Sequence, residues 1–492
     1  MRSPEVLRRT AAAAGVVAAG VLIAVAILAA PWLVAAAVAG AFFLLLSVRI
    51  IRHQRLTAVL IFLIVLLAGS KFRSRDVGAT LSGAVDSQVA YELAMFAALG
   101  WIVFLAITFP VKPVRRVPRT IPLGLVCYAV LAVVSTAWSP TPVLTLVRSL
   151  QLSILVAAAI CLFYRTDPTT ILQALLIALL VHCGTFIALA IAISGGWPQR
   201  LTTSGVSRFT WFAMHPSVIA MLMATAFLLL LASLLEGLPP TWNARRFAVL
   251  RIGGIVVFGA LLLATRARAD FLATLAAAGV MVVRRTRIRP DILAVAVLGG
   301  LAILGFAVTT FGGTDLVGRM LSDDWAGGAY LLRGQTSAGF LSLNGRTLLW
   351  KEMLPLVSAR PVLGWGFEST RSVLLDVFFW AAYAHNALMQ ALMGLGVVGA
   401  GLLMTLFGSC FFVGSARNRG GSDASAFARS AVLGLAVYLG IQAVGSESFA
   451  GTPGFAALVA FLCMLSAADL RQEARATHGG AAPLGQPRAL AW

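Results

Sequence analysis

The sequence contains few charged residues. Only 11% of its 492 residues are Asp, Glu, Lys or Arg, whereas 60% are hydrophobic and the mean hydropathy is +0.93. Soluble domains carry roughly a quarter charged residues, because charge keeps them dispersed in water. This shortage excludes a water-soluble protein, and we predict that the chain is dissolved in a lipid bilayer.

Residues that build metal or disulfide sites are also scarce. The five cysteines lie inside apolar runs at unrelated spacings, which excludes a disulfide framework or a cysteine metal site. Several carboxylates fall in segments that we predict to face outward, but none has the spacing of metal ligands. These carboxylates are Asp76, Asp86, Asp323, Asp324, Glu368, Asp376 and Glu447. We therefore expect no metal site.

Long apolar runs dominate what is present. A helix needs about 20 apolar residues to cross the bilayer, because its backbone must satisfy its own hydrogen bonds in lipid. The candidate spans are residues 11–29, 31–48, 56–69, 88–110, 120–137, 143–163, 170–193, 209–235, 247–265, 269–283, 291–311, 385–414, 430–444 and 454–468. We predict an all-α polytopic transmembrane helix bundle of about 12–14 spans, with an even total.

The formal charge of +20 comes from arginines and lysines that gather in alternate loops, such as Arg49, Arg52 and Arg55. Basic residues in short loops stay on the cytoplasmic side, so the pattern places both termini in the cytoplasm. Because the excess charge is spread over loops beside the membrane, we expect membrane lipids and no nucleic acid as partners.

These runs divide the chain into four parts. Residues 1–311 and 385–470 are predicted to be transmembrane helices, and residues 471–492 a disordered cytoplasmic tail. Residues 312–384 form a large extracytoplasmic loop, which is long enough to have a function of its own. Within it, apolar residues at helical spacing from Leu349 to Val357 predict a short amphipathic helix that ends at Arg360-Pro361.

Arginines at the outer ends of the predicted spans can form an anion site. Arg266 and Arg268 lie in the sequence Arg-Ala-Arg-Ala-Asp between two spans, and Arg208 begins another. Guanidinium groups bind phosphate oxygens through paired donors and keep their charge when partly desolvated. The alternative is that Arg268 pairs with Asp270 or extends to the membrane interface.

Two histidines are candidates for proton transfer. His385-Asn386 opens the span after the large loop, and His215-Pro216-Ser217 lies inside the span predicted from residue 209. Histidine accepts protons near neutral pH, although each could instead serve packing or cap a helix. The sequence Gly394-Leu-Gly396-Val-Val-Gly399 has the spelling of a dinucleotide loop, but it follows no strand and indicates close helix packing.

The stretch from Asn344 to Gly399 resembles the O-antigen ligase and O-antigen polymerase family, bacterial membrane proteins that join polyprenyl-linked glycans. The shared pattern is Gly345-Arg346 with Trp350, Arg360-Pro361, Gly364-Trp365-Gly366, and His385-Asn386 before a glycine-rich span. Upstream, Arg268-Ala-Asp-Phe-Leu-Ala resembles the arginine segment of the family, although Ala267 replaces the usual serine and Arg266 competes for the register. Arg208 through Ser217 resembles a further family segment, with serine in place of asparagine.

The resemblance implies a membrane glycosyltransferase on the extracytoplasmic face of the bacterial cytoplasmic membrane. The donor would be a glycan on a polyprenyl diphosphate, and the acceptor a hydroxyl of a glycan or glycolipid. The resemblance then implies that no cofactor is needed, neither a nucleotide nor a metal. His385 would take the hydroxyl proton and Arg268, or Arg266, would stabilise the leaving diphosphate. The remaining implied substrate-binding residues are Arg208, His215, Arg346, Trp350 and Asn386.

Two other functions fit parts of the sequence. A glycosyltransferase that uses a single sugar on a polyprenyl phosphate would need a carboxylate base in an early outer loop, where Asp76 and Asp86 lie. A transporter or flippase of lipid-linked glycans would place charges near the membrane midplane in two related halves. No half-repeat is visible, and the candidate charges gather near one face.

Overall fold

The computed structural model describes residues 43–44, 46–72, 86–109, 119–194, 199–201, 207–236, 244–285, 346–375, 377, 383–413 and 423–478. The chain divides into two compact units, residues 1–57 and 58–492. In the first unit, residues 46–50 are helical and the Thr57 hydroxyl donates a hydrogen bond to Ile50 O at 3.1 Å. The sites described below lie in the second unit.

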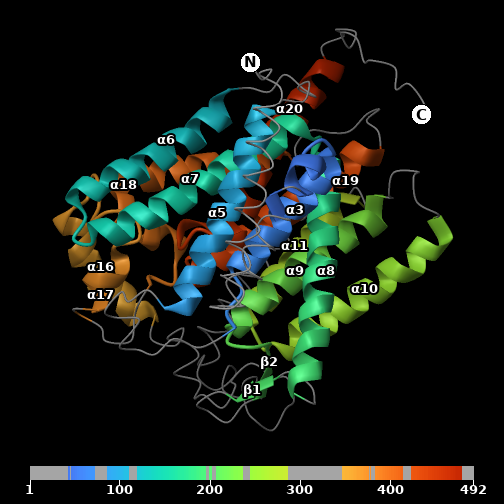
Figure 1. Cartoon of the computed structure of the whole chain (residues 1–492), viewed down its shortest axis with the longest axis horizontal. Coiled ribbons are helices and arrows are strands. Elements are labelled where there is room, and N and C mark those ends of the chain that lie inside the picture. Colours follow the sequence, from blue (N-terminus) through green and yellow to red (C-terminus); the bar gives the residue numbers. More distant parts are fainter. Residues whose placement is uncertain are drawn as a thin grey trace, which may run out of the picture. The chain divides into compact units, whose positions relative to one another are not determined.

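Helices make up nearly all of the described structure (Figure 1). The α-helices are α3 (Gln54–Ala68), α5 (Ser87–Thr108), α6 (Thr120–Val134), α7 (Pro142–Arg165), α8 (Pro168–Ser194), α9 (Pro216–Glu236), α10 (Ala244–Ala264), α11 (Arg268–Arg285), α16 (Arg346–Ala359), α17 (Thr370–Leu375), α18 (Ala387–Gly408), α19 (Asp423–Gly445) and α20 (Phe455–His478). Three 3-10 helices are η1 (Ser135–Trp138), η2 (Ser409–Val413) and η3 (Ser448–Ala450). Two short strands, β1 (Gln199–Leu201) and β2 (Ser207–Phe209), pair antiparallel with Arg200 opposite Arg208.

Eight of the described helices are long and apolar enough to cross a membrane: α5, α6, α7, α8, α9, α18, α19 and α20. The spans of α6 and α18 each continue into the 3-10 helix that follows. This confirms the prediction of an all-α polytopic membrane protein. The predicted spans 11–29 and 291–311, and most of 31–48, lie outside the described residues, so the total of 12–14 and its even number stay predictions. The proposed boundaries near residues 311 and 384 lie in or beside segments that are not described.

The boundaries of two predicted segments need correction. The span predicted from residue 209 begins at Pro216, because residues 207–209 form β2 and a turn follows it. His215 therefore precedes α9 instead of lying inside it. At the other end of the chain, α20 continues to His478, beyond residue 470 where we expected the tail to begin.

Prolines and capping side chains explain where several helices begin. Pro142, Pro168 and Pro216 are the first residues of their helices, where the missing N–H of proline costs nothing. Asp86 caps α5 by accepting a hydrogen bond from Val89 N at 2.9 Å, and Asn386 caps α18 by accepting one from Met389 N at 3.0 Å.

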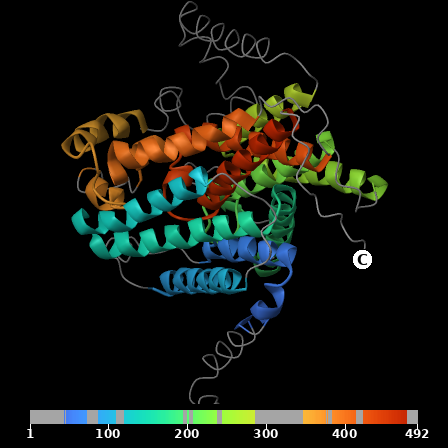
Figure 2. The same ribbon diagram turned by 90° about the horizontal axis from the view of Figure 1, so that it is seen from above.

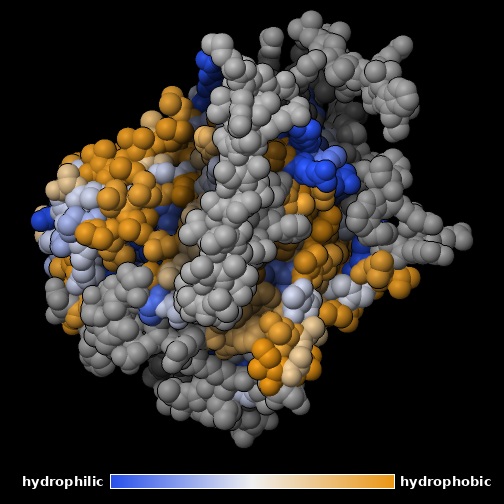
Figure 3. All heavy atoms as spheres, viewed as in Figure 1, coloured by the Kyte–Doolittle hydropathy of each residue, from blue (hydrophilic) through white to orange (hydrophobic). Residues whose placement is uncertain are grey.

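The second unit has an interior helix layer and an apolar exterior. In their most apolar stretches, α20 is 89% buried and α19 72%, whereas α5, α6 and α8 are each 33% buried. Contacts of α19 with α9, α11 and α20, and of α20 with α7, place these helices side by side (Figure 2). Large apolar side chains remain exposed on α6 and α10, and Figure 3 displays a broad hydrophobic face over the region of α6. Such a surface is stable only in contact with lipid.

The loop after α16 is joined to α18 by an exchange of backbone hydrogen bonds. Gly396 has φ 63° and ψ −164°, which breaks the helical pattern inside α18. Met393 O and Gly394 O, which would accept from the N–H groups four residues later, instead accept from Trp365 N and Gly366 N, both at 2.8 Å. The N–H groups that lose these acceptors belong to Val397 and Val398. They donate instead to the loop, to Pro361 O at 2.8 Å and to Val362 O at 3.3 Å. The loop therefore satisfies these four backbone groups of the kinked helix.

Only glycines allow this exchange. A Cβ on Gly396 would collide with the Val362 carbonyl, and one on Gly364, which has φ 65°, would lie 2.7 Å from the backbone of Gly394. The two glycine motifs noted in the sequence thus meet each other. We expected close helix packing through the small residues of Gly394–Gly399, but at Gly394 and Gly396 the close partner is this loop.

We predict that G396A destabilises the protein, whereas G401A does not. Left-handed backbone costs a non-glycine residue about 1–2 kcal/mol before the collision with Val362 is added. Gly401 lies in the same helix, is exposed and has open space where a Cβ would go, so alanine there should be neutral or slightly stabilising. Thermal unfolding of both variants in detergent measures the difference, and equal melting temperatures would contradict the role assigned to Gly396.

Candidate active site

The first part of the site lies where α10 turns into α11. Arg208, on β2, is buried and donates from Nε to Thr265 O at 2.8 Å. Asp270, in the first turn of α11, is buried and accepts a hydrogen bond from the Tyr438 hydroxyl of α19 at 2.6 Å. The positive charge of Arg208 acts on the Asp270 carboxylate. Arg268, the first residue of α11, is half-buried beside this cluster.

The second part comes from the N-terminus of α16. Arg346 Nη1 donates to Gly445 O at 2.6 Å, at the end of α19, and a Cβ on Gly445 would also lie 3.7 Å from Ala269 Cβ. The start of α11 and the start of α16 therefore meet at the C-terminus of α19. Trp350, one turn along α16, donates from Nε1 to Ala384 O at 2.8 Å. This contact fixes the segment that carries the next candidate residue.

His385 lies in that segment, just before α18. Its Nδ1 is 3.7 Å from Glu447 Oε2, and Asn386 beside it donates to Val444 O at 3.2 Å. His385 is 35% exposed and Glu447 28% exposed at the side chain, so both can be reached by a ligand. A carboxylate on one side of an imidazole orients the ring and stabilises its protonated form, which leaves Nε2 available to a substrate.

Opposing effects set the proton affinity of His385. Burial lowers its pKa, Glu447 raises it, and the guanidinium of Arg346 lowers it again, so that the pKa lies below the ordinary histidine value. At neutral pH the imidazole is therefore mostly neutral and able to accept a proton. Burial also lowers the pKa of Arg346, while Glu447 and Asp270 raise it.

Backbone strain is concentrated around this site. Among the described residues, five non-glycine residues have positive φ, and four of them lie at or beside the site: Arg266, Glu368, His385 and Ser448. Left-handed backbone at a non-glycine residue persists only where the surroundings enforce it, and it is enriched at functional sites. The strained residues mark the loops that carry His385 and Glu447.

A second polar cluster borders the first. Glu368, which is 6% exposed, accepts hydrogen bonds from Thr452 Oγ1 at 3.0 Å and from Gln390 Nε2 at 3.3 Å. The Arg148 guanidinium on α7 acts on this carboxylate and also forms an ion pair with Glu92 of α5. Burial raises the pKa of Glu368 to about 7, against the lowering effect of Arg148.

The structure brings most of the predicted site residues together. Arg208, Arg268, Arg346, Trp350, His385 and Asn386 lie on elements that contact one another around the ends of α11, α16, α18 and α19. His215 is exposed, and its ring accepts a hydrogen bond from Ser217 N at 3.3 Å in the turn before α9. Asp86 caps α5, while Asp76 lies outside the described residues.

Sequence reasoning did not single out Glu447, Glu368 or Gln390. In the sequence the two glutamates are outward carboxylates without distinctive spacing, and Gln390 lies in an apolar run. A signal exists for one of them: Glu368 lies two residues after Gly364-Trp365-Gly366, a segment that the sequence predicts to be a turn. Their relation to His385 depends on contacts between residues up to 84 positions apart, which no local pattern contains.

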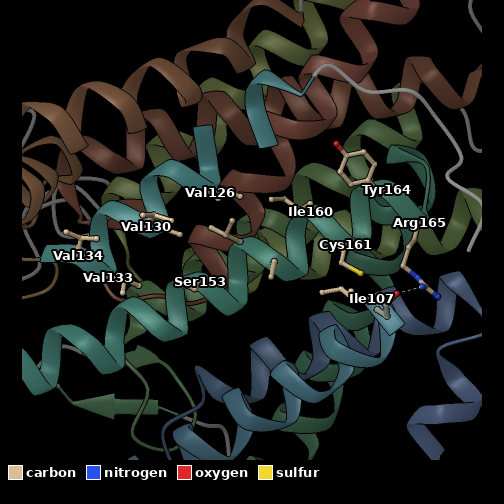
Figure 4. Close-up of a pocket in the computed structure, with 14 residues that line it drawn as sticks. Ile107, Val126, Val130, Val133, Val134, Ser153, Ile160, Cys161, Tyr164 and Arg165 are labelled. Carbon is tan, nitrogen blue, oxygen red and sulfur yellow. Dashed lines mark hydrogen bonds between the residues drawn. The ribbon is translucent and has the colours of Figure 1, made fainter. Parts of the chain in front are cut away.

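An apolar groove of about 620 Å³ lies apart from these clusters, along α5, α6 and α7 (Figure 4). Valines of α6 line one end, and Ile107, Cys161 and Tyr164 line the other. Arg165 at that end donates to Ala106 O and Phe109 O at 2.6 and 2.7 Å, which fixes the C-terminus of α5. The groove suits a hydrocarbon chain and not a glycan, because it offers few polar groups.

The part of the chain that carries most of these residues is similar to a known protein family. Residues 253–404 match a family model described as O-antigen ligase, and this region includes Arg268, Arg346, Trp350, His385 and the glycine exchange. Among curated proteins, none matches the chain. The match supports a role as a membrane glycan ligase or polymerase. We conclude that residues 253–404 of this multi-pass membrane protein are similar to the O-antigen ligase family.

Proposed function

We propose that this protein is an inverting glycosyltransferase that joins a polyprenyl-diphosphate-linked glycan to a hydroxyl of a second glycan or a glycolipid. The observation that carries the proposal is the meeting of His385, Glu447 and Arg346 at the C-terminus of α19, beside the N-terminus of α11. Transfer of a glycan from a diphosphate needs a neutral base for the acceptor proton and fixed positive groups for the leaving diphosphate. Here both lie on neighbouring elements.

In this proposal the acceptor oxygen attacks the anomeric carbon of the donor glycan. The bond from that carbon to the diphosphate oxygen breaks, and polyprenyl diphosphate leaves with the electron pair. The acceptor proton passes to His385 Nε2, and Glu447 stabilises the resulting imidazolium. A single displacement inverts the anomeric configuration.

The arginines would stabilise the charge on the leaving diphosphate. Arg346 is held by Gly445 O and by the charges of Glu447 and Asp270, and Arg208 is held by Thr265 O. Guanidinium groups fixed before the reaction gain more from developing charge than mobile ones, because no reorganisation is needed. We assign Arg268 to the same role in preference to Arg266, because Arg268 adjoins Ala269, which lies next to Gly445 and Arg346.

The proposal also places the site on the extracytoplasmic face of the cytoplasmic membrane, where the positive-inside distribution of basic loops puts these helix ends. A base at Asp86, as required for the single-sugar alternative, is less favoured because its carboxylate caps α5. The transporter alternative is also less favoured, because the described cluster lies at helix ends and does not require passage of substrate through the bundle.

Replacement of His385 tests the base directly. In proteoliposomes supplied with a polyprenyl-diphosphate oligosaccharide and an acceptor glycan, we expect H385A to lower the rate of glycosidic-bond formation by about 100-fold or more. H53Q is the matched control, because His53 is exposed in the turn before α3 and should be dispensable. Unchanged transfer by folded H385A, or translocation of the donor without a new bond in the wild type, would refute the proposal.

Lysine substitutions separate the two candidate arginines. R268K keeps the charge but loses the paired donors that match a diphosphate, so we expect its kcat to fall by about tenfold or more, while R266K remains near the wild-type value. Steady-state kinetics on the same donor decides between them. The reverse order of effects would transfer the role to Arg266.

The pH dependence follows from the charges around His385. Because only the neutral imidazole accepts a proton, kcat/KM should decline as the pH falls below the ordinary histidine range and be level near neutrality. Glu447 raises the pKa of His385, so E447Q should move this decline to lower pH. A profile of kcat/KM against pH for both proteins tests this, and a shift of E447Q to higher pH would show that Glu447 does not act on His385 in this way.

A further inference from the structure

Glu368 connects the two segments that carry the proposed base and its carboxylate. It lies two residues after Gly366, in the loop that exchanges hydrogen bonds with α18, and its backbone has φ 58°. Phe367 N beside it donates to Ser135 Oγ at 2.9 Å, at the end of α6. Glu368 is therefore fixed at a buried position from which its two carboxylate oxygens point to different partners.

One oxygen is linked to the His385 segment. Gln390 Nε2, in the first turn of α18, donates to Glu368 Oε1 at 3.3 Å. The other end of the same amide, Gln390 Oε1, accepts a hydrogen bond from Ala384 N at 3.1 Å. Since Ala384 precedes His385, and its carbonyl also accepts from Trp350, the backbone that adopts φ 49° at His385 is held from both sides.

The second oxygen is linked to the Glu447 segment. Thr452 Oγ1 donates to Glu368 Oε2 at 3.0 Å and lies 3.3 Å from the Tyr383 hydroxyl. Between Glu447 and Thr452 the chain forms η3, in which Ala450 N donates to Glu447 O at 2.9 Å. The position of Thr452 therefore constrains where Glu447 can lie.

We propose that Glu368 is a positioning residue, whose carboxylate oxygens hold the His385 segment and the Glu447 segment in the arrangement that permits proton transfer. The inference rests on the proposed function for its catalytic meaning, but the geometry that it explains is the 3.7 Å approach of His385 to Glu447. Glu368 does not itself touch the imidazole, and it acts through Gln390 and Thr452.

The burial of the Glu368 carboxylate supports the positioning role. A carboxylate taken out of water is costly unless both oxygens are hydrogen-bonded, and burial raises the pKa of Glu368 to about 7. Either protonation state keeps two oxygens for the two donors. The charged or titratable groups that act on Glu368 come from several elements, and they are Arg148 of α7, Tyr128 of α6, Tyr383 and Glu447.

The inference is tested by the titration of His385, which is independent of catalysis. The full-length chain is labelled with [13C]histidine and titrated by NMR in detergent, and the His385 signal is identified by its loss in H385Q among the five histidines. Because Glu447 raises the pKa of His385, loosening the connection should lower that pKa in E368A and T452V, towards the value in E447Q. In E368Q the amide oxygen can still accept from Gln390 and the amide nitrogen can donate to the Thr452 hydroxyl, so the two segments remain bridged. His385 in E368Q should therefore titrate as in the wild type.

Two comparisons make the test specific. T225V removes a buried hydroxyl that only donates within α9, and it should leave the His385 titration unchanged. In an E447Q background, E368A should produce no further fall in the His385 pKa, since both changes act on one interaction. In the transfer assay, E368A and T452V should lower kcat by up to about 100-fold, with a smaller effect on KM.

Each outcome decides a separate claim. If E368A fails to fold, T452V gives the same information with an isosteric change. Wild-type titration of His385 in folded E368A and T452V would overturn the positioning role, and so would an equal fall in E368Q and E368A, because the charge and not the bridge would then be responsible. If the titrations agree with expectation but the wild type transfers no glycan, the proposed function fails while the positioning role of Glu368 stands.

Discussion

The exchange of backbone hydrogen bonds at Gly396 is the constraint on which the rest of the site depends. A kink inside a helix in lipid exposes donors and acceptors that water cannot satisfy, so another part of the chain must pair with them. Here the loop containing Pro361 and Gly366 supplies those partners. Because this loop is fixed to α18, the helix before it, α16, and the carboxylate after it, Glu368, acquire defined positions beside the N-terminus of the same helix.

The candidate site is assembled from the ends of helices and not from their middle turns. Arg346 begins α16, Arg268 begins α11, His385 and Asn386 precede α18, and Glu447 follows α19. Helix N-termini carry partial positive charge and unpaired N–H groups, which favour anions such as diphosphate. The C-terminus of α19 contributes the opposite polarity, and there Gly445 O accepts from Arg346. The polar chemistry is thereby kept at one edge of an apolar bundle.

Much of the fold could be predicted because hydropathy follows directly from local sequence. Each predicted span that falls on described residues corresponds to a helix, and α16 appears where the apolar spacing from Leu349 predicted it. The error at residue 209 has a physical cause, since an apolar run can form a short strand and turn before a proline starts the helix. Of the proposed site, the sequence indicates the arginines and His385. Glu447 and Glu368 were not assigned, because a single carboxylate in a loop has no local signature.

By itself, the sequence determined that this chain is a helical membrane protein, that its basic loops are distributed unequally, and which motif residues were candidates for chemistry. These properties depend on composition and on short-range spacing. Only the tertiary structure decided that Glu447 lies beside His385 and that Glu368 bridges the two segments. Those relations arise where loops distant in sequence meet on the exposed edge of the bundle, and they are set by hydrogen bonds between Glu368, Gln390 and Thr452 that form only after the helices have packed.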